Sequence, residues 1–482
     1  MNDHNQDHWK HKIGLWAGVA IVIGSVVGSG VFVSASSMAR AIPDRGWFLG
    51  IWVLAAAVTV LGALTQSELA ARIPKSGGPY QYLRHAYGDV FGFLYGWANY
   101  TVIGSGAVAA ISFVCASYLS EVLHLPPTLP EWATWGIPIP VLGSIYPFAD
   151  FQIKLLAVFF IFSLTILNVR GIHWSAMFQS VASTAKIIAI FSVIAGIFLL
   201  APDEWPQASS TAISSMNTDQ FLLALTVALA GAFWAYDGWG TISYLSDEVK
   251  NPSKTVPLAI LIGTALIVVL YLSINLSYIR VLSMEEIAGA SGGRVASIAM
   301  GKVLGIGGAA LVSILIATST FDCTNATITA NARVICTMAR DKAFWKVAGK
   351  IHKKFSSPHA ALWMQAVWAS ILLLSGSFEI LTSMYVFVNW LTYGLLGVAL
   401  FRVRFQQKHL PSPTFTTPLY PWIPLAFVGF ACFYTVFALY VDVHSYVTGE
   451  QTFLKSLAGL VLMLSGLPMY YFWKWRDKIT SA

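Results

Sequence analysis

Two pairs of glycines lie two residues apart inside apolar segments, where glycine weakens a helix. Gly28 and Gly30 flank Ser29 in "GSVVGSGVF", and Gly238 and Gly240 fall in "GAFWAYDGWGTISY". Positions two apart on a helix differ by about 200° of rotation, so one packing face cannot use both glycines. Close packing of small residues is the alternative. An unwound backbone fits the spacing better, and a membrane tolerates it only beside protein, water or a ligand.

Unwound segments leave main-chain groups that could bind a charged ligand. The N-terminus of a half-helix offers N–H groups to an anion, and the C-terminus offers carbonyls to a cation. One zwitterion satisfies both, which indicates an amino acid. The two glycine pairs are five apolar segments apart, and an odd repeat of five spans inserts its second copy upside down. Paired breaks in inverted halves predict a substrate site near the middle of the membrane.

Three ionisable residues lie deep in apolar segments: Lys186, Asp237 and Asp322. Each costs about 2.5–3.5 kcal/mol at the centre of a bilayer, so each is expected to have a partner or a task. A structural Lys–Asp pair is one interpretation, and a lysine side chain that reaches the membrane interface is another. The hydroxyl-rich residues 318–320 could hold a cation or bond back to their own helix.

The composition places these residues in a membrane protein. The chain has 482 residues, of which 56% are hydrophobic and 11% charged, against about a quarter charged in soluble domains. About 20 apolar residues span a bilayer as a helix. Twelve such segments predict an all-α integral membrane protein that forms one polytopic domain, residues 1–482: 13–40, 47–71, 90–121, 154–169, 176–201, 220–244, 257–279, 304–332, 360–376, 381–402, 420–440 and 455–473.

The distribution of charge predicts the topology. The formal net charge is +7. Of the 29 Lys and Arg residues, 21 fall on one set of alternate tails and connections, 7 on the other, and Lys186 within a span. This is the positive-inside bias, so we expect both termini to be cytoplasmic and the protein to lie in the cell membrane. The basic pI therefore reports topology and does not indicate a nucleic-acid partner.

The residues give no indication of an enzyme. The four cysteines all lie in or at the ends of apolar segments and form no disulfide or zinc pattern. None of the ten histidines falls at mid-membrane, and no nucleophile–base pair is apparent. We therefore expect no catalytic residue, no metal and no cofactor.

Several motifs resemble the amino acid–polyamine–organocation superfamily, and within it the L-type amino acid transporter family. They are "GSVVGSGVF", "ELAARIPKSGGPYQYL", "FWAYDGW" followed by "DEVKNPSKTVP", "STFDCTN" and "VNWLTY", and they span nearly the whole chain. The resemblance implies a LeuT-type fold with two inverted five-helix repeats, at about 13–201 and 220–402. It also implies that helices 1 and 6 are unwound and that two extra helices follow, at about 420–473.

The resemblance also implies the roles of particular residues. The substrate carboxylate is expected at the backbone around Val27 to Gly30, and the ammonium at carbonyls near Ile23, Trp234 and Tyr236. Trp234 matches a bulky aromatic residue that covers the occupied site and acts as a gate. The implied substrate-binding set is Ile23, Val26, Val27, Gly28, Ser29, Gly30, Phe233, Trp234, Tyr236, Asp237 and Asn325.

Lys186 matches a lysine that, in sodium-independent members, projects into the place of the sodium ion of sodium-driven relatives. Ser319 and Thr320 match the hydroxyl side of that place, and Asn325 and Asn389 resemble pocket or coupling residues. Asp322 stands where relatives often have a small residue. Animal members pair with a glycoprotein through a cysteine after span three, but residues 122–153 contain none. A disulfide-linked heavy chain is therefore not expected.

These features predict a sodium-independent secondary transporter that exchanges neutral L-amino acids by alternating access. A proton-coupled symporter remains an alternative, because a buried Lys186 could exchange a proton. So does a transporter of cationic amino acids, because Asp237 could receive a cationic side chain. Lys186 argues against sodium coupling, since an ammonium and Na⁺ cannot share one small site. Paired broken helices suit a closed midplane site better than the open pore of a channel.

Overall fold

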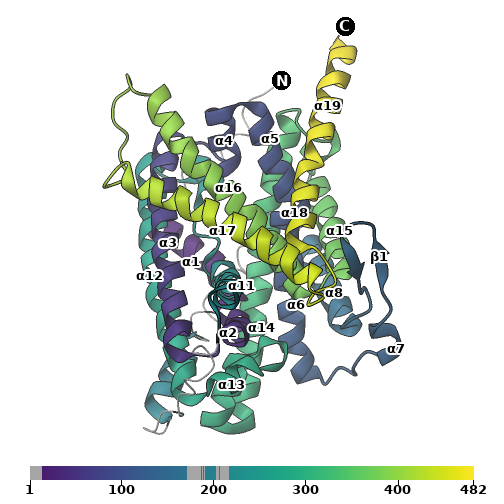
Figure 1. Ribbon diagram of the computed structural model, residues 1–482. Coiled ribbons are helices and arrows are strands. Elements are labelled where there is room, and N and C mark those ends of the chain that lie inside the picture. The colour runs from purple at the N-terminus through teal and green to yellow at the C-terminus, as the bar shows by residue number, and fades with distance from the viewer. Residues whose placement is uncertain are drawn as a thin grey trace.

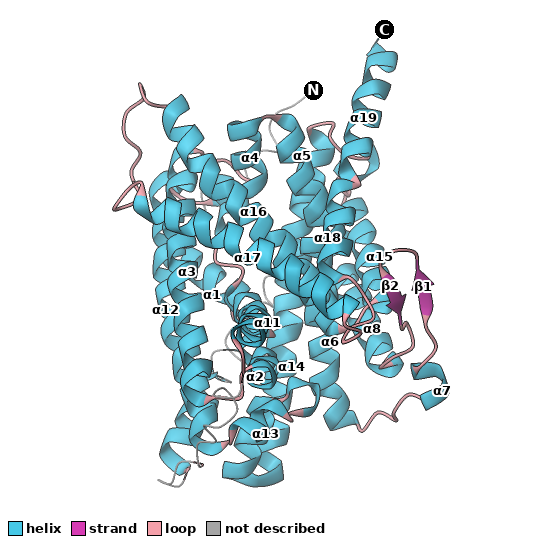
Figure 2. Cartoon of the chain, viewed as in Figure 1, coloured by secondary structure: helices cyan, strands magenta, loops and turns pink. Residues whose placement is uncertain are grey.

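The computed structural model describes residues 13–170, 186, 188, 190–201, 206, 216–355 and 357–481 (Figure 1). Residues 1–12, and much of the segment predicted as the span 176–201, lie outside the described residues. Within this part of the chain the fold is almost entirely helical (Figure 2). The one sheet it contains is an antiparallel hairpin of β1 (Ile137–Ile139) and β2 (Gly143–Ile145). The prediction of an all-α membrane protein is confirmed.

The first half of the chain forms the helices α1 (Leu15–Val26), α2 (Gly30–Ala41), α3 (Arg45–Arg72), α4 (Pro79–Tyr87), α5 (Asp89–Ala98), η2 (Asn99–Ile103), α6 (Gly104–Leu123), α7 (Pro130–Ala133) and α8 (Phe151–Val169). The second half forms α11 (Thr218–Tyr236), η3 (Thr241–Glu248), α12 (Pro252–Val281), α13 (Met284–Ala288), η4 (Ser291–Gly293), α14 (Val295–Arg340), η5 (Lys346–Gly349), α15 (His359–Ser375), α16 (Phe378–Gln406), α17 (Trp422–Val447), α18 (Lys455–Leu464) and α19 (Gly466–Ser481).

Length and composition allow nine of the described helical segments to cross a membrane. The pair α1 and α2, bent by 40°, adds a tenth if it is one span. Two shorter apolar helices, Ile190–Leu200 and His359–Ser375, lie where two further spans are predicted. The count of twelve spans and the inverted relation of the two halves stay predictions.

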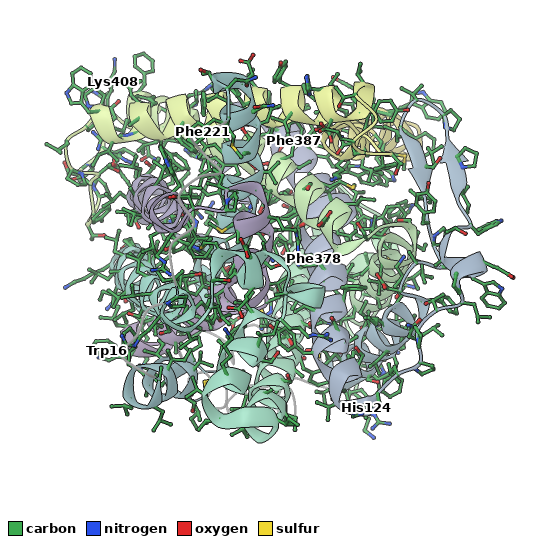
Figure 3. The ribbon with its side chains drawn as sticks, turned by 60° about the horizontal axis from the view of Figure 1, so that its bottom comes forward. Trp16, His124, Phe221, Phe378, Phe387 and Lys408 are labelled. Carbon is green, nitrogen blue, oxygen red and sulfur yellow. The ribbon has the colours of Figure 1, made fainter. Side chains whose placement is uncertain are left out.

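Apolar side chains lie on the outside of the bundle as well as in its core. Phe159, Val269 and Val436 are each more than 60% exposed, although they belong to long apolar helices. Such a surface is rare on a soluble monomer and fits contact with lipid tails. In Figure 3, side chains fill the space between the helices, and Trp16, His124 and Lys408 lie at the edge of the molecule.

Both predicted helix breaks are present. Helix α1 ends at Val26 and α2 begins at Gly30, while α11 ends at Tyr236 and η3 begins at Thr241. Gly238 has a φ of +105°, a conformation that residues with a Cβ rarely adopt. The second break therefore depends on a glycine that no other residue can replace without backbone strain.

The two breaks touch each other through their main chains. A Cβ on Gly30 would lie 2.3 Å from Ala235 Cα, and a Cβ on Gly238 would lie 3.1 Å from the carbonyl oxygen of Ser25. A side chain at either glycine would push the broken helices apart. Helix α12 packs against α1 and α3, helices α3 and α16 contact α11, and α14 contacts α1, α2 and α6. Figure 1 shows α4 and α19 at one end of this bundle, the α4 end, and α13 at the other, the α13 end.

Candidate functional site

A cavity of about 110 Å³ lies between the two helix breaks. Segments of α3, α4, α5, η2, α6, α14 and α16 complete its wall. Six residues predicted to bind substrate line it: Val26, Gly28, Ser29, Gly30, Trp234 and Asp237. Asn389, predicted as a pocket or coupling residue, lines it too. The other predicted residues are not part of this wall: Ile23, Val27, Phe233, Tyr236, Asn325, Lys186, Ser319 and Thr320.

The main chain of the first break presents donors to the cavity. Among the described contacts, the N–H groups of Gly28, Ser29 and Gly30 have no acceptor. The carbonyls at the end of α1 are already occupied. Gly24 accepts from Lys186 at 2.7 Å, and Val26 accepts from the Tyr271 hydroxyl at 2.9 Å. This break can therefore bind an anion, and it has few acceptors left for a cation.

Two more carbonyls near the end of α1 have partners. Ile23 accepts from the Val27 N–H at 2.8 Å, and neither residue lines the cavity. Ser25 accepts weakly from the Cys323 thiol, with sulfur and oxygen 3.8 Å apart. Helix α1 thus has few free carbonyl groups for a substrate ammonium group.

The end of α11 supplies the acceptors that α1 lacks. Asp237 follows α11 with an extended backbone, and its N–H does not continue the helical ladder. Within the described residues, no N–H bonds to the carbonyls of Trp234, Ala235 or Tyr236. These carbonyls lie at the negative end of a helix, so they favour a cation. Donors at one break and acceptors at the other match the two charges of an amino acid.

The Asp237 carboxylate is held by three side chains of α16. Tyr385 and Tyr393 donate their hydroxyls to it, and Asn389 donates its amide at 2.8 Å. Tyr385, Asn389 and Tyr393 are spaced four residues apart, so they share one face of α16. The acid therefore ties the second break to α16, and most of its acceptor capacity is used.

Lys186 lies behind the first break and is 1% exposed. Besides donating to Gly24, its ammonium nitrogen lies 3.4 Å from an Asp322 carboxylate oxygen on α14. The Asp322 side chain is 2% exposed, so this is a buried ion pair. The hydroxyl of Thr320 bonds to its own helix, and that of Ser319 has no partner among the described residues. Lys186 thus joins α1 to α14 through a carbonyl and a carboxylate.

The predicted residues that do not line the cavity have other surroundings. Phe233 packs against Trp390, with ring centroids 4.3 Å apart. Tyr236 packs against Tyr271 at 5.1 Å. Asn325 accepts from the Asn168 amide at 2.7 Å, which joins α14 to α8. These contacts hold helices together around the site.

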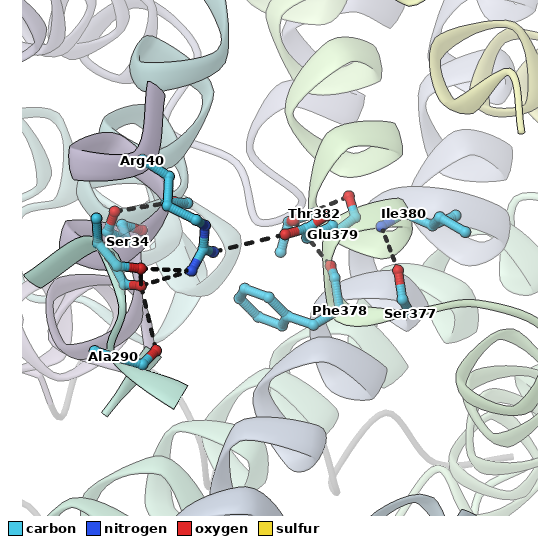
Figure 4. A network of polar contacts seen from close by, with 11 residues as sticks. Ser34, Arg40, Ala290, Ser377, Phe378, Glu379, Ile380 and Thr382 are labelled. Carbon is cyan, nitrogen blue, oxygen red and sulfur yellow. Dashed lines mark hydrogen bonds and ion pairs between the residues drawn. The ribbon is translucent and has the colours of Figure 1, made fainter. Parts of the chain in front are cut away.

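Trp234 separates the central cavity from a larger one toward the α13 end. It lines both cavities, and the larger has a volume of about 690 Å³. Its ring packs edge-on against Tyr385 at 4.9 Å and Phe378 at 6.1 Å. Beyond it, Arg40 of α2 reaches toward Glu379 of α16, with nitrogen and oxygen 3.7 Å apart (Figure 4). The α13 side of the cavity is thus covered by an aromatic side chain with a loose ion pair outside it.

The α4 side of the cavity is closed by different contacts. The hydroxyls of Tyr95 and Tyr244 are 2.6 Å apart, and Arg333 of α14 pairs with Glu248 of η3 at 2.7 Å. Tyr80 of α4 donates to Asp341 at 2.9 Å. Burial, followed by the nearby Asp341 carboxylate, raises the pKa of Tyr80, so it stays a neutral donor. The cavity is therefore covered toward both ends of the bundle.

The polar residues of the cavity wall that sequence reasoning did not single out include Gln66, Asn99, Cys323, Asn331 and Tyr385. Asn99 and Asn331 lie inside apolar segments, where an uncharged amide also needs a partner. The argument that singled out Lys186, Asp237 and Asp322 as polar groups in the membrane could therefore have found these two asparagines. No group of histidine, cysteine and acidic residues able to hold a metal occurs in the part of the chain that the structure describes.

The model of the amino acid permease family matches residues 13–463. The chain belongs to the amino acid permease family. It is 28% identical over 479 residues to the human large neutral amino acids transporter small subunit 2, covering 98% of this chain and 82% of that one. It is 28% identical over 478 residues to the serine/threonine exchanger SteT of Bacillus subtilis, covering 98% and 99%. It is 30% identical over 471 residues to the human cystine/glutamate transporter, covering 97% and 86%.

Membership of the amino acid permease family establishes the general activity. The protein is a multi-pass membrane transporter of small molecules and not an enzyme. The resemblance drawn from its motifs is confirmed by the family match, which covers both helix breaks and the cavity between them.

Proposed function

We propose that this amino acid permease is a sodium-independent exchanger of neutral L-amino acids that works by alternating access. The observation that carries the proposal is the position of Lys186. Its ammonium group lies between the Gly24 carbonyl of the first break and the Asp322 carboxylate, two oxygen ligands that would suit a sodium ion. A fixed cation here removes both the room and the electrostatic need for Na⁺.

The two covers of the cavity support alternating access. Trp234 covers the α13 side, whereas Tyr95 with Tyr244, and Glu248 with Arg333, close the α4 side. Because the two covers use different residues, one can open while the other stays closed. A channel would need both sides open together, which this arrangement does not favour.

The main chain of the two breaks supports a zwitterionic substrate. Free N–H groups at Gly28 to Gly30 would bind the carboxylate, and the free carbonyl of Trp234, which lines the cavity, would bind the ammonium. Asp237 has most of its acceptor capacity filled by α16, which supports neutral substrates. The second candidate, exchange of cationic amino acids, rests on Asp237 having no cationic partner among the described salt bridges.

The arrangement in the membrane is part of the proposal. The α4 end would face the cytoplasm, since 21 of the 29 Lys and Arg residues fall on its tails and connections. Both termini would then be cytoplasmic in the cell membrane. The two inverted repeats would be residues 13–201 and 220–402. Residues 122–153 contain no cysteine, so no disulfide-linked partner is expected.

Counterflow in liposomes tests the proposal. Purified protein is reconstituted into vesicles loaded with unlabelled alanine, and entry of labelled alanine, leucine and lysine is measured in sodium and in choline buffer. The proposal expects uptake of a neutral amino acid that requires internal substrate and is equal in both buffers. Strict dependence on sodium would contradict it. Uptake into empty vesicles driven by an inward proton gradient would favour the proton-coupled alternative, and selective uptake of lysine would favour the cationic one.

A further inference from the structure

Besides Asn389, which is bonded to Asp237, three carboxamide side chains from three separate elements line the central cavity: Gln66 of α3, Asn99 of η2 and Asn331 of α14. Asn99 is one helical turn from Tyr95, and Asn331 is two residues from Arg333, and both of these belong to the closure at the α4 side. Asn99 and Asn331 therefore lie on the part of the cavity wall nearest the α4 end, and Gln66 faces the same cavity from α3. We call the three amides the amide cluster.

Gln66 is 3% exposed, and its Nε2 has no partner among the described residues. Its amide packs directly over Gly240, because a Cβ on that glycine would lie 2.5 Å from Gln66 Nε2. Glycine at this position of the second break thus leaves room for the amide beside the cavity. A buried donor without an acceptor is costly, so a group that enters the cavity and accepts from it gains a favourable bond.

Asn99 and Asn331 bond to each other only through one long contact. Asn99 Nδ2 donates to Asn331 Oδ1 at 3.3 Å, and the two residues are 1% and 7% exposed. This uses one of the donors of Asn99 and leaves its oxygen and the Asn331 NH₂ without another partner in the described contacts. Asn99 opens the π-helical turn of η2, and such turns often occur at functional sites.

The wall beside the amides also carries small and apolar side chains. Ile103, Ala107 and Ala330 lie beside the amides, and the whole cavity holds only about 110 Å³. The carboxylate and ammonium of an amino acid would be engaged by the two breaks, so its side chain is the part left to meet this wall. A short side chain that both accepts and donates hydrogen bonds fits the cluster, and a large apolar one does not.

We propose that the amide cluster binds the side chain of the substrate and selects a short one ending in a hydroxyl or a carboxamide. This inference rests on the proposed exchange of neutral amino acids and names the substrate class for that same cavity. A site built to hydrogen-bond a substrate group discriminates strongly against an isostere that lacks it, because the buried polar groups are then left unpaired.

Isosteric pairs of amino acids test this proposal. Counterflow of labelled alanine is measured against increasing unlabelled threonine or valine, and then asparagine or leucine. In each pair the molecules have nearly the same shape, and only one carries the polar group. The wild type is expected to prefer threonine over valine, and asparagine over leucine, by at least about tenfold.

Variants then show which residues cause the preference for a polar side chain. Gln66→Leu and Asn331→Leu are expected to bring both ratios to within about threefold of one, by weakening the polar member of each pair. Asn275→Leu is the matched control, because Asn275 is a fully buried amide of α12 that bonds within its own helix and does not line the cavity. It is expected to keep the wild-type ratios. For a variant that binds without exchanging, thermal stabilisation by each amino acid in detergent gives the same ratio.

The failures of the two proposals are distinguishable. If the wild type exchanges alanine but threonine and valine compete equally, the amide cluster does not read the side chain and only water fills it. The same conclusion follows if the cluster variants keep the wild-type ratios. Absence of alanine exchange in the wild type would instead overturn the proposed function itself.

Discussion

Lys186 offers the sharpest test of how this permease works without sodium. Its ammonium lies 3.4 Å from the Asp322 carboxylate, and both side chains are at most 2% exposed. With an effective dielectric constant of about 20, Coulomb's law gives an attraction of about 5 kcal/mol at this distance. Removing one member of a buried pair typically destabilises a protein by about 3–5 kcal/mol, because the other charge stays buried and unpaired.

We therefore expect Lys186→Met to lower the thermal unfolding temperature strongly and to abolish exchange. Replacing both members, in Lys186→Met with Asp322→Asn, removes the unpaired charge and is expected to recover most of the thermal stability. It is not expected to recover exchange, because the Gly24 carbonyl still lacks its donor and the first break still lacks a cation behind it. The assays are thermal unfolding in detergent and alanine counterflow in choline buffer.

Two outcomes would refute this reasoning. If the double variant exchanges alanine as well as the wild type, Lys186 serves only to neutralise Asp322 during insertion and folding. If the wild type itself needs sodium, the ammonium does not replace a bound cation. Thr320→Val is a useful control, since its hydroxyl donates to carbonyls of its own helix. It is expected to leave exchange within about twofold of the wild type, whereas a role as a cation ligand predicts a large loss.

Three further predictions concern the cavity and its cover. Gly30→Ala is expected to abolish counterflow, because its Cβ would lie 2.3 Å from Ala235 Cα, whereas Gly24→Ala meets nothing within 4 Å and should retain exchange; equal activity of the two variants would argue against the tight contact of the breaks. Trp234→Ala is expected to slow exchange more than it weakens equilibrium binding, since the ring covers the site, and unchanged exchange rates would remove its gating role. Small thiol reagents are expected to block exchange through Cys323, which lines the cavity, and bound amino acid should slow the labelling measured by mass spectrometry; labelling indifferent to substrate would place the ligand elsewhere.

The sequence predicted the helix breaks because glycine spacing has a direct conformational meaning. Gly28 and Gly30 could not share one packing face, and Gly238 adopts a φ that favours glycine. Hydropathy likewise located the long helices, since a membrane span requires about 20 consecutive apolar residues, and such a run is visible in the sequence. The periodicity of apolar residues says less about which helix faces pack against each other. The sequence therefore did not show that Gly30 packs on Ala235, or that Gly238 packs on Ser25.

The composition of the cavity wall was harder to predict. Phe233 and Trp234 are adjacent, yet only Trp234 lines the cavity, because a rotation of about 100° sends the other ring toward Trp390. Asn325 has a polar partner on α8 that no sequence pattern connects to it. Gln66 and Asn331 enter the site from helices whose register depends on packing. The packing of helices that are distant in the sequence decides which polar residues come together in the cavity.

The hydrogen bonds from α16 to Asp237 connect parts of the site that lie far apart in the sequence. Tyr385 donates to Asp237 and also packs against Trp234, the cover on the α13 side. One turn further along the same face of α16, Asn389 donates to the same acid. After another turn so does Tyr393, which packs on Trp239 within the break. A shift of α16 therefore cannot release the cover without disturbing the second break. Because that break carries the free carbonyls, we infer that release of the substrate ammonium and movement of the cover are coupled through α16.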